Sequence, residues 1–239
     1  MPIALHVTFV LLAIVLPTFL FINGRKGRLG KDPRPLVWTP KLKVRMYYGN
    51  GILLLSLSLL VLIVWYFSGR PFAALGLGWG RTPYDPVAIG IIFAFLGLYA
   101  IDLYTETGSP ERQRDTQRKF RELGFLPTSG SQYLHFLFLC ACAGVGEEIV
   151  YRGFLITYCS EVFGEGAWAV AGILLVPAVS FGLAHIYQGG HAVLKIVAMA
   201  LLFGFFFYRT GTLWPLILLH TAIDAVGGLL SWYLDEKRG

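Results

Sequence analysis

The sequence predicts an all-helical protein, a polytopic transmembrane bundle of about seven spans, within a range of six to eight. Hydrophobic residues make up 56% of the 239 residues and charged residues only 14%, whereas a typical soluble domain carries about 25% charged residues. Apolar stretches of about 20 residues, the length that crosses a bilayer, recur along the chain. Basic residues concentrate between these stretches, as they do in the loops of membrane proteins.

The apolar stretches define the order of the elements. We expect spans at about residues 3–22, 49–67, 87–104, 133 to beyond 155, 167–187, 192–208 and 213–234. The first 22 residues contain no Lys or Arg, unlike the charged start of a secretory signal peptide, so we interpret this stretch as a retained first span. After the third span, Ser109 is placed to cap a short charged helix that runs through Leu123. Pro177 lies inside the fifth span, where it favours a kink.

The placement of the basic residues predicts the topology and the partners of the loops. Eight of the 20 Lys and Arg lie at 25–45, and five more lie at 112–121. Because loops rich in Lys and Arg stay in the cytoplasm, we expect the N-terminus outside and the C-terminus in the cytoplasm. Basic loops beside membrane spans also account for the net charge of +6. The partner expected at these loops is therefore anionic lipid of the bilayer, and not nucleic acid.

Four ionisable residues inside the apolar spans are the candidate functional residues: Glu147, Glu148, His185 and His220. A charged side chain at the centre of a membrane helix costs about 2.5–3.5 kcal/mol on insertion scales. A chain that keeps several such groups is therefore expected to use them in a polar site. Helix counting places Glu147 at mid-membrane and His185 nearer the inner surface, so tilted or kinked helices are needed to bring them level.

The spacing of the acidic residues predicts different roles for them. Glu148 and Arg152 are four residues apart and share a helix face, so they can form an ion pair. Glu147 is rotated by about 100° from Glu148 and lacks that partner. It is then the free carboxylate, suited to general base and acid catalysis. A buried salt bridge that only locks helices together would explain Glu148 and Arg152 but not Glu147.

Two other spans contribute polar groups. Phe181 precedes His185 by one helical turn, so its ring can pack on the imidazole. His220 and Asp224 are also four residues apart and point into one groove. There Asp224 can orient the imidazole, support a metal ligand or hydrogen-bond a substrate. Asp102 lies near a helix end with no basic residue in register, and we assign it no role.

These residues match the motifs of a known family. The chain carries Glu-Glu-xxx-Arg at 147–152, Phe-xxx-His at 181–185 and His-xxx-Asp at 220–224. In this order, the motifs resemble those of the CPBP family (CAAX proteases and bacteriocin-processing enzymes, also called Abi), which includes the type II CAAX prenyl endopeptidase. The resemblance covers about residues 70–232. It departs from the eukaryotic prenyl endopeptidases at Asp224, where they have Asn.

The resemblance implies a membrane-embedded endopeptidase of the glutamate-peptidase type. Glu147 would activate a water molecule, helped by His185, and the water would attack a peptide carbonyl. His220 and Asp224 would contact the developing oxyanion or hold the substrate. His220 is the better donor, because an Asp224 carboxylate donates no hydrogen bond unless it is protonated. The residues implied to shape the site are Glu148, Arg152 and Phe181.

The resemblance also implies a division of the chain and a location. Residues 1–69 would form N-terminal transmembrane helices with a basic cytoplasmic loop, and residues 70–239 the CPBP-type catalytic transmembrane core. The compact chain favours a bacterial inner (plasma) membrane. Bacteria do not normally prenylate their own proteins. The expected partner is therefore a membrane-associated peptide or protein, with a prenylated CaaX-type substrate as one candidate.

The cofactor and the function each have an alternative. Glu147, His185 and His220 would supply a His₂Glu zinc site, as in a metalloprotease. The chain has no HExxH motif, and we favour a mechanism without metal. Cys140 and Cys142 face different directions on a helix, so they are not expected to bind metal together. The alternative function is a non-catalytic bacteriocin-immunity or scaffolding membrane protein of the same fold. A transporter would show repeated halves, which the sequence lacks.

Overall fold

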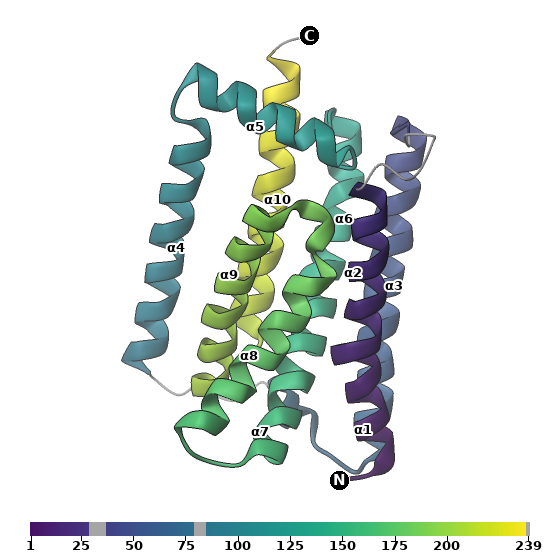
Figure 1. Ribbon diagram of the computed structural model, residues 1–239, viewed down its shortest axis with the longest axis vertical. Coiled ribbons are helices and arrows are strands. Elements are labelled where there is room, and N and C mark those ends of the chain that lie inside the picture. Colours follow the sequence, from purple (N-terminus) through teal and green to yellow (C-terminus); the bar gives the residue numbers. More distant parts are fainter. Residues whose placement is uncertain (29–36, 79–84, 238–239) are drawn as a thin grey trace.

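The computed structural model describes residues 1–28, 37–78 and 85–237 and confirms the predicted all-helical membrane fold (Figure 1). In this described part there is no strand, and seven helices are long and apolar enough to cross a membrane. The spans are Ile3–Gly24, Pro40–Phe67, Pro86–Thr107, Gly130–Phe163, Ala167–Ala184, Gly190–Thr210 and Trp214–Glu236. The protein is therefore an integral membrane protein.

The seven spans alternate in direction, and the two ends of the chain lie at opposite ends of the bundle. The first span is built from α1 (Ile3–Val10), the π-helix η1 (Leu11–Val15) and α2 (Leu16–Arg28). The next spans are α3 (Pro40–Phe67) and α4 (Pro86–Thr107), with the short η2 (Phe72–Leu75) between them. The helix α5 (Pro110–Leu123) then crosses one end of the bundle. The fourth span joins α6 (Gly130–Glu147), η3 (Glu148–Ile156) and α7 (Thr157–Phe163). The last three spans are α8 (Ala167–Ala184), α9 (Gly190–Thr210) and α10 (Trp214–Glu236), with η4 (Ile186–Gln188) between α8 and α9.

Two helix starts show how local sequence sets the boundaries. Ser109 caps α5 by accepting a hydrogen bond from the backbone N–H of Arg112, and α5 ends at Leu123, both as predicted. The second span, in contrast, begins at Pro40 and not near residue 49. Thr39 caps this helix, and proline at the first helical position is compatible with its fixed φ angle. The basic residues after Pro40 therefore belong to α3, and only part of the predicted basic loop remains between the spans.

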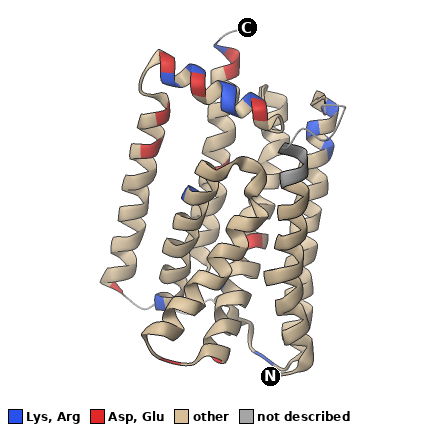
Figure 2. Cartoon of the chain, in the orientation of Figure 1, with Lys and Arg blue, Asp and Glu red and all other residues tan. Residues whose placement is uncertain are grey.

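Charged residues gather at the two ends of the bundle (Figure 2). Lys and Arg are most frequent at the end where α5, the start of α3 and the C-terminus lie. At the opposite end, Arg209 pairs with Asp85 at 2.7 Å, and Arg70 pairs with Glu161. Hydrogen bonds from the backbone of Ala88, from Arg209 and from the backbone of Val87 outweigh the effect of burial and hold the pKa of Asp85 below its usual value. These pairs join segments from different spans on that face.

Asp102 has a basic partner that its own helix did not reveal. The Nζ atom of Lys195 on α9 lies 2.6 Å from Oδ1 of Asp102 and 2.9 Å from Oε1 of Glu106, both on α4. The sequence shows no basic residue in register with Asp102 on its own helix, and the partner comes from another span. Only 17% of the most apolar stretch of α4 is buried in the bundle. The contact with Lys195 therefore helps to hold α4 against α9.

The fourth span is the central element of the bundle. Of the residues in its most apolar stretch of 18, 56% are buried, the largest share among the spans of the described chain. Glycines allow neighbouring backbones to approach it closely. A Cβ atom on Gly144 would lie 2.1 Å from Oγ1 of Thr221 on α10, and one on Gly146 would lie 2.9 Å from the carbonyl oxygen of Leu54 on α3. This close contact between α6 and α10 brings the acidic motif beside the last histidine motif.

We expect Gly144→Ala to force α6 and α10 apart, because the new methyl group would overlap Thr221. Overpacking of this kind costs about 1–3 kcal/mol, so the melting temperature in detergent should fall. The matched control is Gly227→Ala on α10, where a Cβ atom would meet nothing within 4 Å. Equal melting temperatures for the two variants would contradict the proposed close packing.

Candidate active site

The two carboxylates lie at a change of helix type in the central span. Glu147 is the last residue of α6 and Glu148 the first residue of the π-helix η3, which continues through Ile156. The spacing of Glu148 and Arg152 predicts an ordinary α-helix at this point, whereas the structure has a π-helix. A π-helix has a wider turn and is often found at functional sites. The Glu148 side chain is fully buried, whereas that of Glu147 is 12% exposed.

Glu148 is the centre of a buried hydrogen-bonded network. Its Oε1 atom accepts a hydrogen bond from NH1 of Arg152 at 2.9 Å, so the predicted ion pair is present. The same oxygen lies 2.7 Å from Nδ1 of His220. The guanidinium of Arg152 also lies over the rings of Phe181 and Phe203, at 4.9 and 5.4 Å from their centroids. The Glu148 carboxylate therefore joins the fourth and seventh spans, and the rings around Arg152 add the fifth and sixth.

His220 is held by Glu148 and presents its second nitrogen to two other acids. An ionised carboxylate only accepts hydrogen bonds, so Nδ1 of His220 donates to Glu148. Its Nε2 atom lies 3.6 Å from Oε2 of Glu147 and 3.7 Å from Oδ2 of Asp224. These distances are too long for direct hydrogen bonds. The residue that orients the imidazole is thus Glu148, and Asp224, which the sequence offered for this task, faces the other nitrogen.

His185 and Phe181 complete the arrangement from α8. His185 follows the last residue of α8, and its Nδ1 atom lies 2.8 Å from the carbonyl oxygen of Phe181. The Phe181 ring lies 4.4 Å from the His185 ring, as the spacing predicted, and 6.4 Å from the His220 ring. The two imidazoles therefore flank one aromatic ring. The shared ring brings His185 and His220 to the same part of the bundle, although helix counting predicted different depths for His185 and the acidic motif.

Tyr187 lies beside the candidate site, although no motif in the sequence indicates it. Its ring stacks on that of His185 with the centroids 6.1 Å apart, and it contacts the Phe125 ring at 6.2 Å. Desolvation raises the pKa of Tyr187 to about 12, partly offset by a hydrogen bond from Gln188, with further increases from the charges of Glu147 and Asp224. The residue as a whole is 44% exposed. Its position two residues after His185, in the turn η4, was the only signal in the sequence.

The zinc alternative finds little support in the arrangement of the side chains. Among the described residues, no group of three or more His, Cys, Asp or Glu is arranged to hold a metal ion. Glu147, His185 and His220 therefore do not fit a three-ligand site as they stand. Cys140, Cys142 and Cys159 are buried, and none of them forms a disulfide.

Comparison with known proteins supports the resemblance drawn from the motifs. Residues 129–226 match the family model described as Type II CAAX prenyl endopeptidase Rce1-like. This segment contains every expected site residue, so the match supports an assignment to the CPBP (CAAX protease) family. The match supports a CAAX-type intramembrane protease in general and does not favour the immunity or scaffolding alternative. The comparisons with curated proteins and with solved structures gave no match.

We expect Arg152→Met to destabilise the protein strongly, because it removes the cation from a fully buried carboxylate. Breaking a buried ion pair in this way costs about 3–5 kcal/mol. The control is Arg121→Met, whose pair with Asp235 is 61% exposed on the arginine side and should contribute at most about 1 kcal/mol. Thermal unfolding in detergent measures both, and similar melting temperatures would refute the structural role of Arg152.

Proposed function

We propose that this protein is an intramembrane endopeptidase that hydrolyses a peptide bond of a membrane-associated substrate with water activated by Glu147. The observation that carries the proposal is that the two adjacent acids differ in burial and in bonding partners. Glu148 is fully buried and bonded to Arg152 and His220, whereas Glu147 is partly exposed and lies 3.6 Å from His220 across a gap. A water molecule between such groups can hydrogen-bond to both.

The proposed reaction moves one proton through Glu147. Its carboxylate takes a proton from the water, and the resulting hydroxide attacks the substrate carbonyl carbon. The oxyanion that develops needs hydrogen-bond donors nearby, and we assign this role to Nε2 of His220 when it carries a proton. Collapse of the tetrahedral intermediate breaks the C–N bond, and Glu147 returns the proton to the leaving amine. His185 helps to position the water, and Asp224 holds the substrate near the Nε2 face.

Tyr187 is proposed as an additional donor to the substrate. A hydroxyl with a pKa of about 12 remains protonated at neutral pH, so it can donate a hydrogen bond throughout the physiological range. Its ring is held by His185 on one side and Phe125 on another. The eukaryotic prenyl endopeptidases have asparagine at the position of Asp224, and an asparagine side chain can donate a hydrogen bond. A carboxylate at this position does not donate, so the Tyr187 hydroxyl supplies the donor instead.

The proposed location follows from the distribution of charge, and the proposed substrate follows from the family match. The end of the bundle rich in Lys and Arg is proposed to face the cytoplasm of a bacterium, with the N-terminus outside the inner membrane. Residues 70–239 would form the catalytic core and residues 1–69 the N-terminal helices. The substrate class is a membrane-associated peptide, with a lipidated C-terminus as the first candidate because of the family match.

We expect Glu147→Gln to abolish cleavage of a quenched fluorescent farnesylated CaaX peptide by the purified protein. General base catalysis contributes about 10²–10⁴-fold to the rate, and glutamine keeps the shape of the side chain while removing the base. The control is Glu165→Gln in the exposed turn before α8, which should cleave at the wild-type rate. Equal cleavage by the Glu147→Gln variant would exclude Glu147 as the base. If wild-type protein also fails to cleave a peptide library in lipid vesicles, the endopeptidase proposal is overturned.

We expect Tyr187→Phe to lower kcat about tenfold with little change in KM, since it removes one neutral hydrogen-bond donor that acts mainly in the transition state. The ring stacking on His185 is retained in this variant. Tyr208→Phe, at the far end of α9, is the matched control and should not change either constant. An unchanged kcat for Tyr187→Phe would remove Tyr187 from the mechanism.

A further inference from the structure

One face of α5 carries an array of arginines that the proposed proteolytic site does not use. The helix contains five basic and three acidic residues. Arg114, Arg118 and Arg121 follow one another at spacings of four and three residues, so they share a face. Arg112 and Lys119 lie seven residues apart on a different face of the same helix. The basic residues of α5 are thus divided between two faces.

The helix is held rigidly by hydrogen bonds on its buried face. Oγ1 of Thr116 donates to the carbonyl oxygen of Glu106 at the end of α4, at 2.8 Å. Nε2 of Gln117 donates to the carbonyl oxygen of Leu234 on α10, also at 2.8 Å and fully buried. Arg121 adds a contact to Asp235 at 2.9 Å. The arginine array is therefore fixed in place relative to two spans before any ligand binds.

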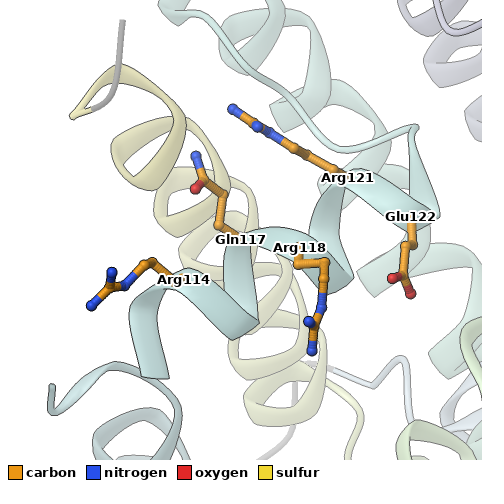
Figure 3. Close-up of a pocket in the computed structure, with 5 residues that line it drawn as sticks. All are labelled: Arg114, Gln117, Arg118, Arg121 and Glu122. Atoms are coloured by element: carbon orange, nitrogen blue, oxygen red, sulfur yellow. The ribbon is translucent and has the colours of Figure 1, made fainter. Parts of the chain in front are cut away.

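A cavity of about 350 Å³ opens on this face of α5 (Figure 3). Its lining consists of Arg114, Gln117, Arg118, Arg121 and Glu122. Three arginines and one glutamate give the lining a net charge of +2. A second cavity, of about 160 Å³, shares Gln117 and Arg121 with the first and also contains Lys43, which is only 6% exposed. Asp235 also lines the second cavity, so charges of both signs lie between the array and the start of α3.

The charges of the array are only partly neutralised by the protein. Arg118 pairs with Asp115 at 3.2 Å, but the two side chains are 70% and 55% exposed, so this pair is weak. Arg114 donates through Nε to the backbone carbonyl of Pro110, and in the described part of the chain no carboxylate forms an ion pair with it. Guanidinium groups bind phosphate through paired hydrogen bonds. The array thus has the donors for a phosphate group, and of its three arginines Arg114 forms no ion pair with an acid of the described chain while the pair of Arg118 is exposed.

The position of α5 indicates where such a phosphate comes from. The span α4 ends at Thr107 and α5 begins at Pro110, so α5 lies at the level where the bilayer meets water. Phospholipid headgroups occupy this level, and clusters of Lys and Arg beside spans bind anionic lipids. We propose that Arg114, Arg118 and Arg121 form a binding site for the phosphate group of an anionic phospholipid headgroup. This site is separate from the carboxylate pair and does not depend on the proposed proteolysis.

The test uses the full-length protein in a neutral detergent, with bound lipid counted by native mass spectrometry during titration with short-chain phosphatidylglycerol. The site variant is Arg114→Gln with Arg118→Gln, which leaves the contact of Arg121 with Asp235 intact. The matched control is Arg112→Gln with Lys119→Gln, which removes the same charge from the other face of α5. Melting temperatures of both variants check that they remain folded; both alter only exposed side chains.

We expect the site variant to bind phosphatidylglycerol about 30-fold more weakly, from about fivefold for each guanidinium that hydrogen-bonds the phosphate. The control removes charge but no donor to the phosphate, so it should bind within about threefold of wild type. Equal weakening by the two variants would show a general charge attraction and overturn the site. Unchanged binding by the site variant, or equal binding of phosphatidylcholine, would also overturn it. Displacement of the lipid by inorganic phosphate at equal concentration would reassign the array to a soluble phosphate and exclude the lipid.

Discussion

The rest of the structure depends on the buried carboxylate of Glu148. A charge at this depth is tolerated only because Arg152 and His220 bond to the same oxygen, and a buried charge without a partner is costly. Arg152 is in turn enclosed by aromatic rings from α8 and α9. One ionic contact thus holds four spans in register around the region where chemistry is proposed, and the glycines of α6 allow α10 to come close enough to complete it.

The π-helix gives the adjacent acids different environments. Residues 148–156 are wound more widely than an α-helix, and this stretch begins between Glu147 and Glu148. The buried oxygen of Glu148 faces Arg152 and His220, while Glu147 faces Nε2 of His220 and remains partly exposed. A wide turn lacks the regular hydrogen bonds of the α-helix and is retained where its geometry is useful. The same junction therefore combines a structural carboxylate and a chemically available one.

The two ends of the bundle use charge in different ways. At the end away from α5, Arg209 and Arg70 are paired with acids from other segments, so charge there joins parts of the protein. At the α5 end, several basic side chains are exposed, and their partners are few and weak. Exposed positive charge beside a bilayer attracts anionic headgroups. Between the two ends lies the buried carboxylate network around Glu148, and the Lys195 contact joins α9 to the last turns of α4.

The sequence by itself determined the fold class, the approximate spans, the cap of α5 and the Glu148–Arg152 pair. Each of these depends on hydropathy or on residues four or fewer positions apart, which composition and helix geometry predict. Only the tertiary structure decided that Glu148 orients His220, that Lys195 neutralises Asp102 and that Tyr187 stacks on His185. The first two contacts join residues 72 and 93 positions apart, and the third depends on the turn that follows α8. Apolar helices carry no periodic signal that tells which faces will meet, because lipid and protein interior are both apolar.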